Sequence, residues 1–288
     1  MNLQISQCLT LEQLIENTPD LPTLPVAVMA VVHETDSPEG SAQSVARYLQ
    51  QDPALAARIL RLSNSAYYSF SRQITEIPEA VVVLGMRVVR NLALIAGSYP
   101  WMVRELKGYE LGPKELWSHS IAVATGSQTV ARRARMNEAE AFSAGLFHNI
   151  GKVAMSIWLE KKVDALMDAS EPSRSFDDIE RELLGHDHAA VGAFLAESWN
   201  LPKTLVRPIR FHHNPEEAED KLTDCVHVAD YLAMSAGYNR GWDGLRYKVD
   251  PGAFLRLGLD KSDLGSLMEE FLQSAETRGK SLEEKLAA

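Results

Sequence analysis

Apolar residues recur at helical spacing along most of this 288-residue chain, and no other feature of the sequence constrains the fold as strongly. Leu55, Ile59 and Leu62, for example, mark one face of a predicted helix. Runs that alternate between apolar and polar residues are few, and no Asn-Gly pair marks a tight hairpin between strands. We therefore predict an all-α protein, built as a helical bundle with an N-terminal helical subdomain.

Capping and breaking residues locate individual helices. Thr10 and Gln13 have the spacing of a capping box, which opens a short helix near the N-terminus. Two long helices are predicted over residues 77–92 and 139–160. Gly85 lies inside the first of these, where a glycine permits a close approach or a bend.

Proline and glycine residues near residues 111–113 indicate a boundary between two halves of the chain. We predict an N-terminal helical half in residues 1–110 and a second helical half in residues 111–240, which carries the candidate site. Residues 241–288 are predicted to form a loop and a charged helical tail. The last ten residues of this tail are expected to fray.

The composition argues against several classes of protein. The 39 acidic and 29 basic residues give a net charge of -10, whereas a general nucleic-acid binder needs a positive field to hold phosphates. Cys8 and Cys225 lie far apart and in no metal-binding spacing, so a cytoplasmic location is expected. The N-terminal residues lack the pattern of a signal peptide, and no apolar run suits a bilayer, so no membrane contact is expected.

The segment from Ala144 to Lys152 reads Ala-Gly-Leu-Phe-His-Asn-Ile-Gly-Lys and lies inside an apolar helical pattern. His148 and Asn149 are consecutive, so a ring nitrogen and a side-chain oxygen can both reach one metal ion. The alternative is a polar kink in a core helix, because a single buried histidine is usually a hydrogen-bonded core residue. Partners elsewhere in the chain favour the metal site.

Further candidate ligands lie in the second half of the chain, each on or beside a predicted helix. The complete set is His119, His148, Asn149, His188, His212, His213 and Asp230. Helix bundles build metal sites from side chains on several facing helices. Neutral imidazoles and a carboxylate suit a divalent transition metal, with iron expected first and zinc, manganese or nickel as alternatives.

The order of these residues resembles that of the HD superfamily of metal-dependent phosphohydrolases, and more closely its cyclic-di-GMP-hydrolysing HD-GYP branch. The matching motifs are His119, His148-Asn149-Ile-Gly-Lys152, His188-Ala-Ala-Val-Gly192-Ala193, His212-His213 and Asp230. The resemblance implies an HD-domain-like bundle with two groups of ligands. These are His119, His148 and Asp230 on one side, and His188, His212 and His213 on the other. It also implies that Lys152 is a catalytic residue that contacts phosphate, with a snorkelling surface lysine as the alternative.

The first half of the chain is similar to the HDOD (HD-related output) domain. The matching motifs are Leu21-Pro22-Thr-Leu-Pro25, Asp52-Pro53-Ala-Leu-Ala-Ala-Arg58-Ile-Leu-Arg-Leu-Ser63-Asn64-Ser65 and Ile77-Pro-Glu-Ala-Val-Val-Val-Leu84-Gly85. The similarity covers roughly residues 20–215. It implies a regulatory module of bacterial signalling, since most HDOD domains have lost the hydrolase residues.

Two departures from these families bear on activity. Asn149 stands where the hydrolases have an aspartate that bridges two metal ions, and an amide oxygen is neutral and a poor bridge. His213 is followed by Asn-Pro-Glu-Glu, without the Gly-Tyr-Pro segment of the HD-GYP branch. We therefore expect a regulatory module that is non-catalytic or weakly active and can bind metal. A signalling protein is its expected partner, with a nucleotide as a further expected ligand.

Two alternative functions remain open. The retained histidines favour a metal-dependent phosphohydrolase that acts on a nucleotide or a cyclic dinucleotide. An oxygenase-like diiron protein is a weaker alternative, because it too needs the bridging carboxylate that Asn149 replaces.

Two other histidines are weaker candidates. The string His186-Asp187 does not stand at the position of the family dyad, and Asp187 is predicted to cap the helix that begins at His188. His227 lies three residues before Asp230, on nearly the same helix face. It is either a hydrogen-bond donor to a metal ligand or an ordinary packed histidine.

Overall fold

The computed structural model describes residues 9–65, 68, 73–169, 174–238, 241–242, 249–260 and 262–287. These residues form helices joined by turns and loops, and they contain no strand, only one isolated bridge between Leu106 and Leu111. The predicted all-α fold is therefore confirmed. None of the helices in the described part of the chain is long and apolar enough to cross a bilayer.

The helices begin and end as follows. The N-terminal ones are α1 (Leu11–Glu16), α2 (Val26–Asp36), α3 (Ala42–Gln50), α4 (Pro53–Ser63), α5 (Ile77–Leu84) and α6 (Met86–Met102). A short 3-10 helix, η1 (Lys107–Tyr109), leads to α7 (Glu115–Arg133), α8 (Glu138–Phe147), α9 (Gly151–Glu160), α10 (Val163–Ala169), α11 (Phe176–Leu184) and α12 (His188–Ser198). The last are α13 (Lys203–Phe211), α14 (Pro215–Ala218), α15 (Lys221–Ser235), α16 (Pro251–Arg256) and α17 (Asp263–Ala287). The predicted capping box of Thr10 and Gln13 is present at the start of α1.

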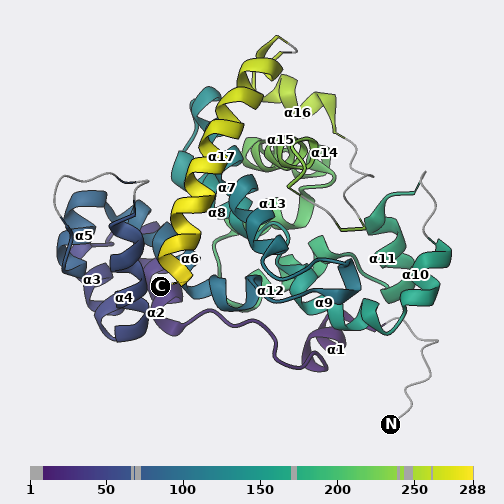
Figure 1. Ribbon diagram of the computed structural model, residues 1–288, viewed down its shortest axis with the longest axis horizontal. Coiled ribbons are helices and arrows are strands. Elements are labelled where there is room, and N and C mark those ends of the chain that lie inside the picture. Colours follow the sequence, from purple (N-terminus) through teal and green to yellow (C-terminus); the bar gives the residue numbers. More distant parts are fainter. Residues whose placement is uncertain are drawn as a thin grey trace.

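Figure 1 shows α2 to α5 grouped at one end of the molecule and α10 and α11 at the other, with α7 and α15 between them. α6 contacts α2 and α4 in the first group, and it reaches α7 and α8 in the centre. α7 packs against α8, α15 and α17 and is buried along most of its length. α17 contacts both α7 and α4, so it joins the centre of the molecule to the N-terminal group.

Two clusters of buried apolar residues form the core. The larger one joins α1 to α6 with residues of α7 to α13, and the smaller one lies mainly between α7, α15 and α17. α7 contributes Trp117 and Ile121 to the larger cluster and Val123 and Val130 to the smaller one. Its position, and with it that of His119, is therefore determined by packing on several sides. The division of the chain at residues 110 and 240 stays a prediction.

The helix predicted over residues 77–92 is interrupted, so its interpretation as one element was wrong. Gly85 has φ +84°, a value that side-chain-bearing residues rarely adopt, and it separates α5 from α6. The backbone N–H of Gly85 still donates to the oxygen of Val81. The glycine thus ends one helix and begins another, and does not bend a continuous one.

The single helix predicted over residues 139–160 was also wrong. α8 ends at Phe147 and α9 begins at Gly151. In the turn between them, the N–H of Ile150 donates to the oxygen of Phe147, and the N–H of Lys152 donates to that of Asn149. His148 and Asn149 therefore occupy a turn between two buried helices, where their side chains can point away from the regular helix faces.

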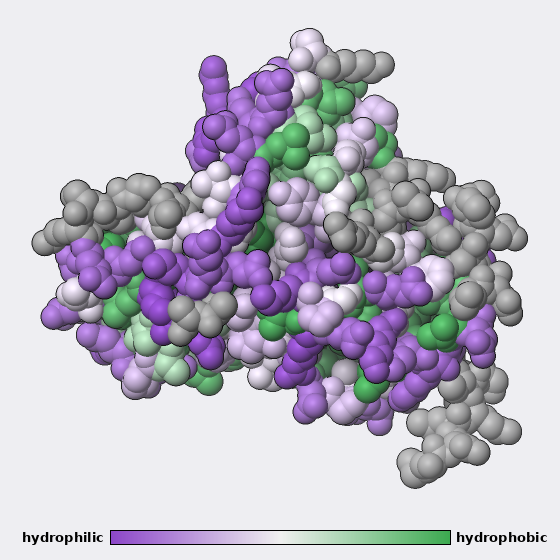
Figure 2. All heavy atoms as spheres, in the orientation of Figure 1, coloured by the Kyte–Doolittle hydropathy of each residue, from purple (hydrophilic) through white to green (hydrophobic). Residues whose placement is uncertain are grey.

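The predicted fraying of the last ten residues was wrong as well. α17 extends to Ala287, and Leu282 near its end is fully buried in the larger apolar cluster. Arg61 on α4 donates from Nε to the backbone oxygen of Lys285 at 3.3 Å. The exposed side of α17 is mainly hydrophilic (Figure 2). The many charged residues of this helix dominate its sequence pattern, so the apolar contacts that anchor the tail are not evident from the sequence.

We expect the Leu282→Ala substitution to lower the free energy of unfolding by about 2–4 kcal/mol, because it removes buried methyl groups and leaves a cavity. Leu272→Ala on the same helix is the matched control, since Leu272 is 43% exposed and its loss should have a much smaller effect. Denaturant unfolding of both variants measures the difference. Equal effects would show that the end of α17 is not anchored by Leu282.

Candidate metal centre

Three helical segments bring the first group of polar side chains together. His119 lies on α7, His148 follows α8 directly, and Asp230 lies on α15. Nε2 of His119 is 3.2 Å from Nε2 of His148 and 3.2 Å from Oδ1 of Asp230. Nε2 of His148 lies 3.8 Å from the same Asp230 oxygen. All three side chains are buried, and these atoms are close enough together to hold one metal ion.

The contact between α7 and α8 depends on Gly145. A Cβ atom at this position would lie 2.6 Å from Oγ of Ser127 and 2.8 Å from Cα of Ala124. A residue without a side chain is therefore required where the two helices meet. Their close approach brings the end of α8, and with it His148, against His119 on α7.

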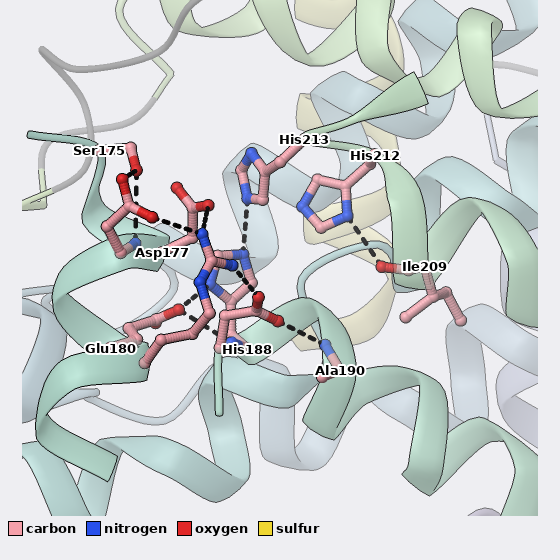
Figure 3. Close-up of polar contacts among 11 residues, drawn as sticks. Ser175, Asp177, Glu180, His188, Ala190, Ile209, His212 and His213 are labelled. Carbon is pink, nitrogen blue, oxygen red and sulfur yellow. Dashed lines mark hydrogen bonds and ion pairs between the residues drawn. The ribbon is translucent and has the colours of Figure 1, made fainter. Parts of the chain in front are cut away.

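The second group lies at the start of α12 and the end of α13. The side chain of Asp187 accepts a hydrogen bond from the backbone N of Ala190 at 2.7 Å, which confirms its predicted capping role and places His188 first in the helix. His212 and His213 follow α13 directly. Nε2 of His213 is 3.0 Å from Nε2 of His188 (Figure 3). One nitrogen of each ring lies within 4.8 Å of the others, so this group can hold a second ion.

The two groups adjoin each other through two of their rings. The ring centroids of His148 and His212 are 5.1 Å apart and meet edge to face. The His212 centroid lies 5.5 Å from that of His188 and 4.0 Å from that of His213. The histidines predicted from the sequence therefore form one continuous cluster in the centre of the bundle, with Asn149 directly beside it in the chain.

Backbone carbonyl groups orient two of the rings. Nδ1 of His148 donates to the backbone oxygen of Gly145 at 2.7 Å, and Nδ1 of His212 donates to that of Ile209 at 2.9 Å (Figure 3). A carbonyl oxygen only accepts hydrogen bonds, so Nδ1 carries the proton in both rings. Nε2 of each neutral ring therefore presents a lone pair toward the neighbouring side chains, as a metal ligand does.

Three buried acceptor atoms at the cluster lack a hydrogen bond of good geometry among the described residues. They are Nε2 of His212, Oδ1 of Asn149 and Oδ1 of Asp230, the last of which lies 3.2 Å from Nε2 of His119. Buried polar atoms are normally hydrogen-bonded, so unpaired lone pairs in the interior need a counterpart. A metal cation is such a counterpart.

Burial determines the protonation of these histidines. It lowers the pKa of His148 to about 3 and that of His213 to about 4, and it lowers the pKa of His212 well below its usual value. Burial by itself would raise the pKa of Asp230, but the hydrogen bond with His119 and the neighbouring histidines hold it below the usual range. These three rings are therefore neutral and Asp230 is ionised at neutral pH, which is the state that metal binding requires.

The donor set therefore fits divalent transition metals. Imidazole nitrogen and carboxylate oxygen in the first group, and three imidazoles in the second, are ligands that iron, zinc, manganese and nickel accept. Both groups contain three such residues, and at least two of each three are buried. All four metals accept these donor atoms, so the donor set does not identify which metal binds.

Lys152 lies close to this cluster. Its side chain is 2% exposed, and Nζ is 5.5 Å from the centroid of the Tyr109 ring, a cation–π distance. The interpretation as a snorkelling surface lysine was therefore wrong. Burial is the largest cause of the lowered pKa of His148 and of His213, and the positive charge of Lys152 is a smaller cause in both. A phosphate contact for Lys152 stays a prediction.

The candidate residues did not include Glu180 and Tyr109, which adjoin His188. Glu180 is fully buried on α11, and Oε2 accepts from Nδ1 of His188 at 2.7 Å and from its backbone N at 2.8 Å. Oε1 accepts from the Tyr109 hydroxyl at 2.5 Å. One signal was available, because Glu180 lies at helical spacing between Phe176 and Leu184 and so on the apolar face of its helix.

The two weaker candidates have partners of their own. Nδ1 of His227 donates to the backbone oxygen of His212 at 2.7 Å, and Nε2 accepts from the backbone N of Asp250 at 2.8 Å. His227 therefore forms a hydrogen bond with the backbone of the candidate ligand His212. This hydrogen bond does not involve the His212 ring. Nε2 of His186 lies 2.9 Å from the backbone oxygen of Leu9, and His186 belongs to neither group.

Comparison with known proteins identifies the family of the chain and several similar proteins. The model of the HDOD domain family matches residues 21–215. A structure from Shewanella amazonensis, described as a "putative phosphohydrolase", is 30% identical with a TM-score of 0.71, and the match covers 93% of this chain and 97% of that one. An uncharacterized protein of Treponema pallidum is 27% identical over 235 residues, which are 77% of this chain and 43% of that protein. A ribonuclease Y of Mycoplasma mycoides is 27% identical over 140 residues, which are 49% of this chain and 21% of that protein.

The helical bundle and its two adjoining groups of buried histidines define a domain of the HD superfamily. Since the family model matches more than half of the sequence, the chain belongs to the HDOD domain family. It spans less than half the length of the curated relatives from Treponema and Mycoplasma.

Proposed function

We propose that the chain is a regulatory HDOD module that binds a divalent transition metal and has little or no phosphodiesterase activity. The observation that carries this proposal is Asn149. It directly follows His148 at the position of the superfamily's aspartate, and its side-chain oxygen is buried and unpaired among the described residues. An amide in this position supports metal contact but not a charged bridge between two ions.

The reason for the low expected activity is charge. Two divalent cations about 4 Å apart repel each other, and a bridging anion offsets this repulsion. Asn149 supplies only a dipole, and the group of His188, His212 and His213 contains no carboxylate. We therefore expect one ion to bind well through the group that includes Asp230, and a second ion to bind weakly. A pair of ions would supply Lewis-acid activation of a phosphoryl group, which a single ion supplies less effectively.

A module of this kind would act through contacts. We propose a signalling protein as its partner, a nucleotide as a further ligand, and the cytoplasm as its location. The family and the net charge of -10 support a soluble regulator more than a general nucleic-acid binder. The metal would then serve stability or sensing.

A metal-dependent phosphohydrolase is the second candidate. Every candidate ligand other than Asn149 is of a type that the hydrolases use, and the rings of His148 and His212 are already oriented by carbonyl groups. The "putative phosphohydrolase" of Shewanella and the ribonuclease Y among the similar proteins support this alternative. Lys152 would then contact phosphate.

Metal analysis and a hydrolysis assay separate the two candidates. We expect the purified protein to contain close to one equivalent of a transition metal per chain. We also expect no hydrolysis of bis(p-nitrophenyl) phosphate or cyclic-di-GMP above background after addition of iron, manganese, zinc or nickel. Robust metal-dependent turnover would favour the phosphohydrolase, and a chain that binds no metal under any of these conditions would reject the metal centre in both proposals.

A further inference from the structure

We infer that Glu180 and Tyr109 position His188 and supply the negative charge that a cation bound by His188, His212 and His213 requires. Glu180 is then a positioning residue, since it would act through the His188 ring and would not contact the metal. This inference rests on the proposed metal binding. It concerns the more weakly bound of the two ions, which the hydrogen bonds of Glu180 and Tyr109 would stabilise through His188.

Both oxygens of Glu180 are engaged in the interior. Oε2 accepts two N–H groups of His188, and Oε1 accepts the Tyr109 hydroxyl. Accepting on both oxygens is the pattern of an ionised carboxylate. The only ion pair of Glu180 among the described residues is with the His188 ring. The buried Lys152, whose Nζ lies 5.5 Å from the centroid of the Tyr109 ring, forms no ion pair with Glu180. A buried carboxylate is normally paired with a cation. A metal on Nε2 of His188 would complete such a pair through the ring.

The Nδ1 partners of three rings differ in charge. His148 and His212 donate to neutral backbone carbonyl groups, whereas His188 donates to a carboxylate. A carboxylate behind an imidazole makes the ring more basic and fixes its orientation, which strengthens its bond to a metal. The first group has an anion of its own in Asp230. None of the three residues of the second group is an anion. The charge of Asp177 acts on His213, but Asp177 is already paired with Arg181, so we assign the equivalent charge to Glu180, which would act through the His188 ring.

Tyr109 keeps the carboxylate in place. It is fully buried at the end of η1, which follows α6 and precedes α7 in the chain. η1 packs closely on α9, because a Cβ atom at Gly108 would lie 2.2 Å from the backbone oxygen of Ser156. The backbone N of Gly108 also donates to Oγ of Ser156 at 3.1 Å. The hydroxyl of Tyr109 thus reaches Glu180 from a segment that is closely packed on α9 and hydrogen-bonded to it.

Glu180→Gln tests the charge with little change in shape. Glutamine can keep an oxygen toward His188 and turn its amide toward Tyr109, whose hydroxyl then accepts. We expect a titration of the metal-free protein with Co²⁺, followed by the visible absorption of the ion, to show a tighter and a weaker binding phase. In the variant the weaker phase should lose affinity by about 10–100-fold, with the tighter phase nearly unchanged. Asp230→Asn should affect the tighter phase instead.

Glu182→Gln is the matched control, since Glu182 lies on the same helix and pairs with Arg174 at the surface. It should bind Co²⁺ as the native chain does. If Glu180→Gln does not fold, Tyr109→Phe keeps the carboxylate and should still weaken the same phase by up to about tenfold. Native affinity in a folded Glu180→Gln variant, or in Tyr109→Phe if the first does not fold, would overturn the inference and leave the proposed function intact. A native chain that binds no Co²⁺ or other transition metal would instead overturn the proposed function, and the inference with it.

Discussion

Replacement of Asn149 by aspartate is expected to add a second tightly bound metal equivalent. The new carboxylate would directly follow His148 in the chain and replace a buried dipole by a full negative charge. After the cost of burying that charge, we expect roughly 3 kcal/mol of added stabilisation for the second ion, which is about 100-fold in affinity. Metal titration measures the affinity, and hydrolysis of bis(p-nitrophenyl) phosphate and cyclic-di-GMP should appear in the variant alone.

Asn137→Asp is the matched control for this experiment. Asn137 caps α8 at the end away from His148, and aspartate caps a helix about as well as asparagine. The control adds the same charge to the chain, so a second metal equivalent in both variants would show a nonspecific effect of charge. A second tightly bound equivalent in the native chain, or none in Asn149→Asp, would contradict the assignment of the lost activity to this residue.

Replacement of Gly151 by alanine is expected to lower the free energy of unfolding by about 3 kcal/mol, at the upper end of the range for overpacking. An added Cβ would lie 1.9 Å from the backbone oxygen of His188 and 2.6 Å from the backbone N of Gly192. Both are backbone atoms, so no side-chain rotation can relieve the clash, and α9 and α12 must move apart. Because His188 belongs to the second group, weaker metal binding should accompany the loss of stability. Denaturant unfolding and Co²⁺ titration measure the two effects.

Gly279→Ala is the comparison for this variant. Gly279 also lies within a helix, α17, but a Cβ there would meet nothing within 4 Å. Alanine in a helix interior is more favourable than glycine by up to about 1 kcal/mol, so this variant should be as stable as the native chain or slightly more so. If Gly151→Ala unfolds like Gly279→Ala, the close crossing of α9 and α12 is not a feature of the protein in solution.

How much of the site could be predicted depends on how far apart in the chain the interacting residues lie. Every histidine of the two groups was a candidate because histidines are rare and stand in a recognisable order. Glu180 was not a candidate, although it lies on the apolar face of its helix. Its partner Tyr109 is 71 residues away in the chain, and no local rule brings these two side chains together. The carboxylate behind His188 therefore became visible only in the folded molecule.

The sequence by itself determined the all-α class and many helix starts, because these depend on interactions within a single turn. The capping box of Thr10 and Gln13 and the cap at Asp187 each join residues three apart, so they can be recognised without knowledge of the fold. Only the tertiary structure decided where the long apolar helices break and whether the charged tail packs. The break after Phe147 and the burial of Leu282 follow from contacts between distant segments, whose summed packing energy exceeds the small local preference for a continuous helix or a frayed end.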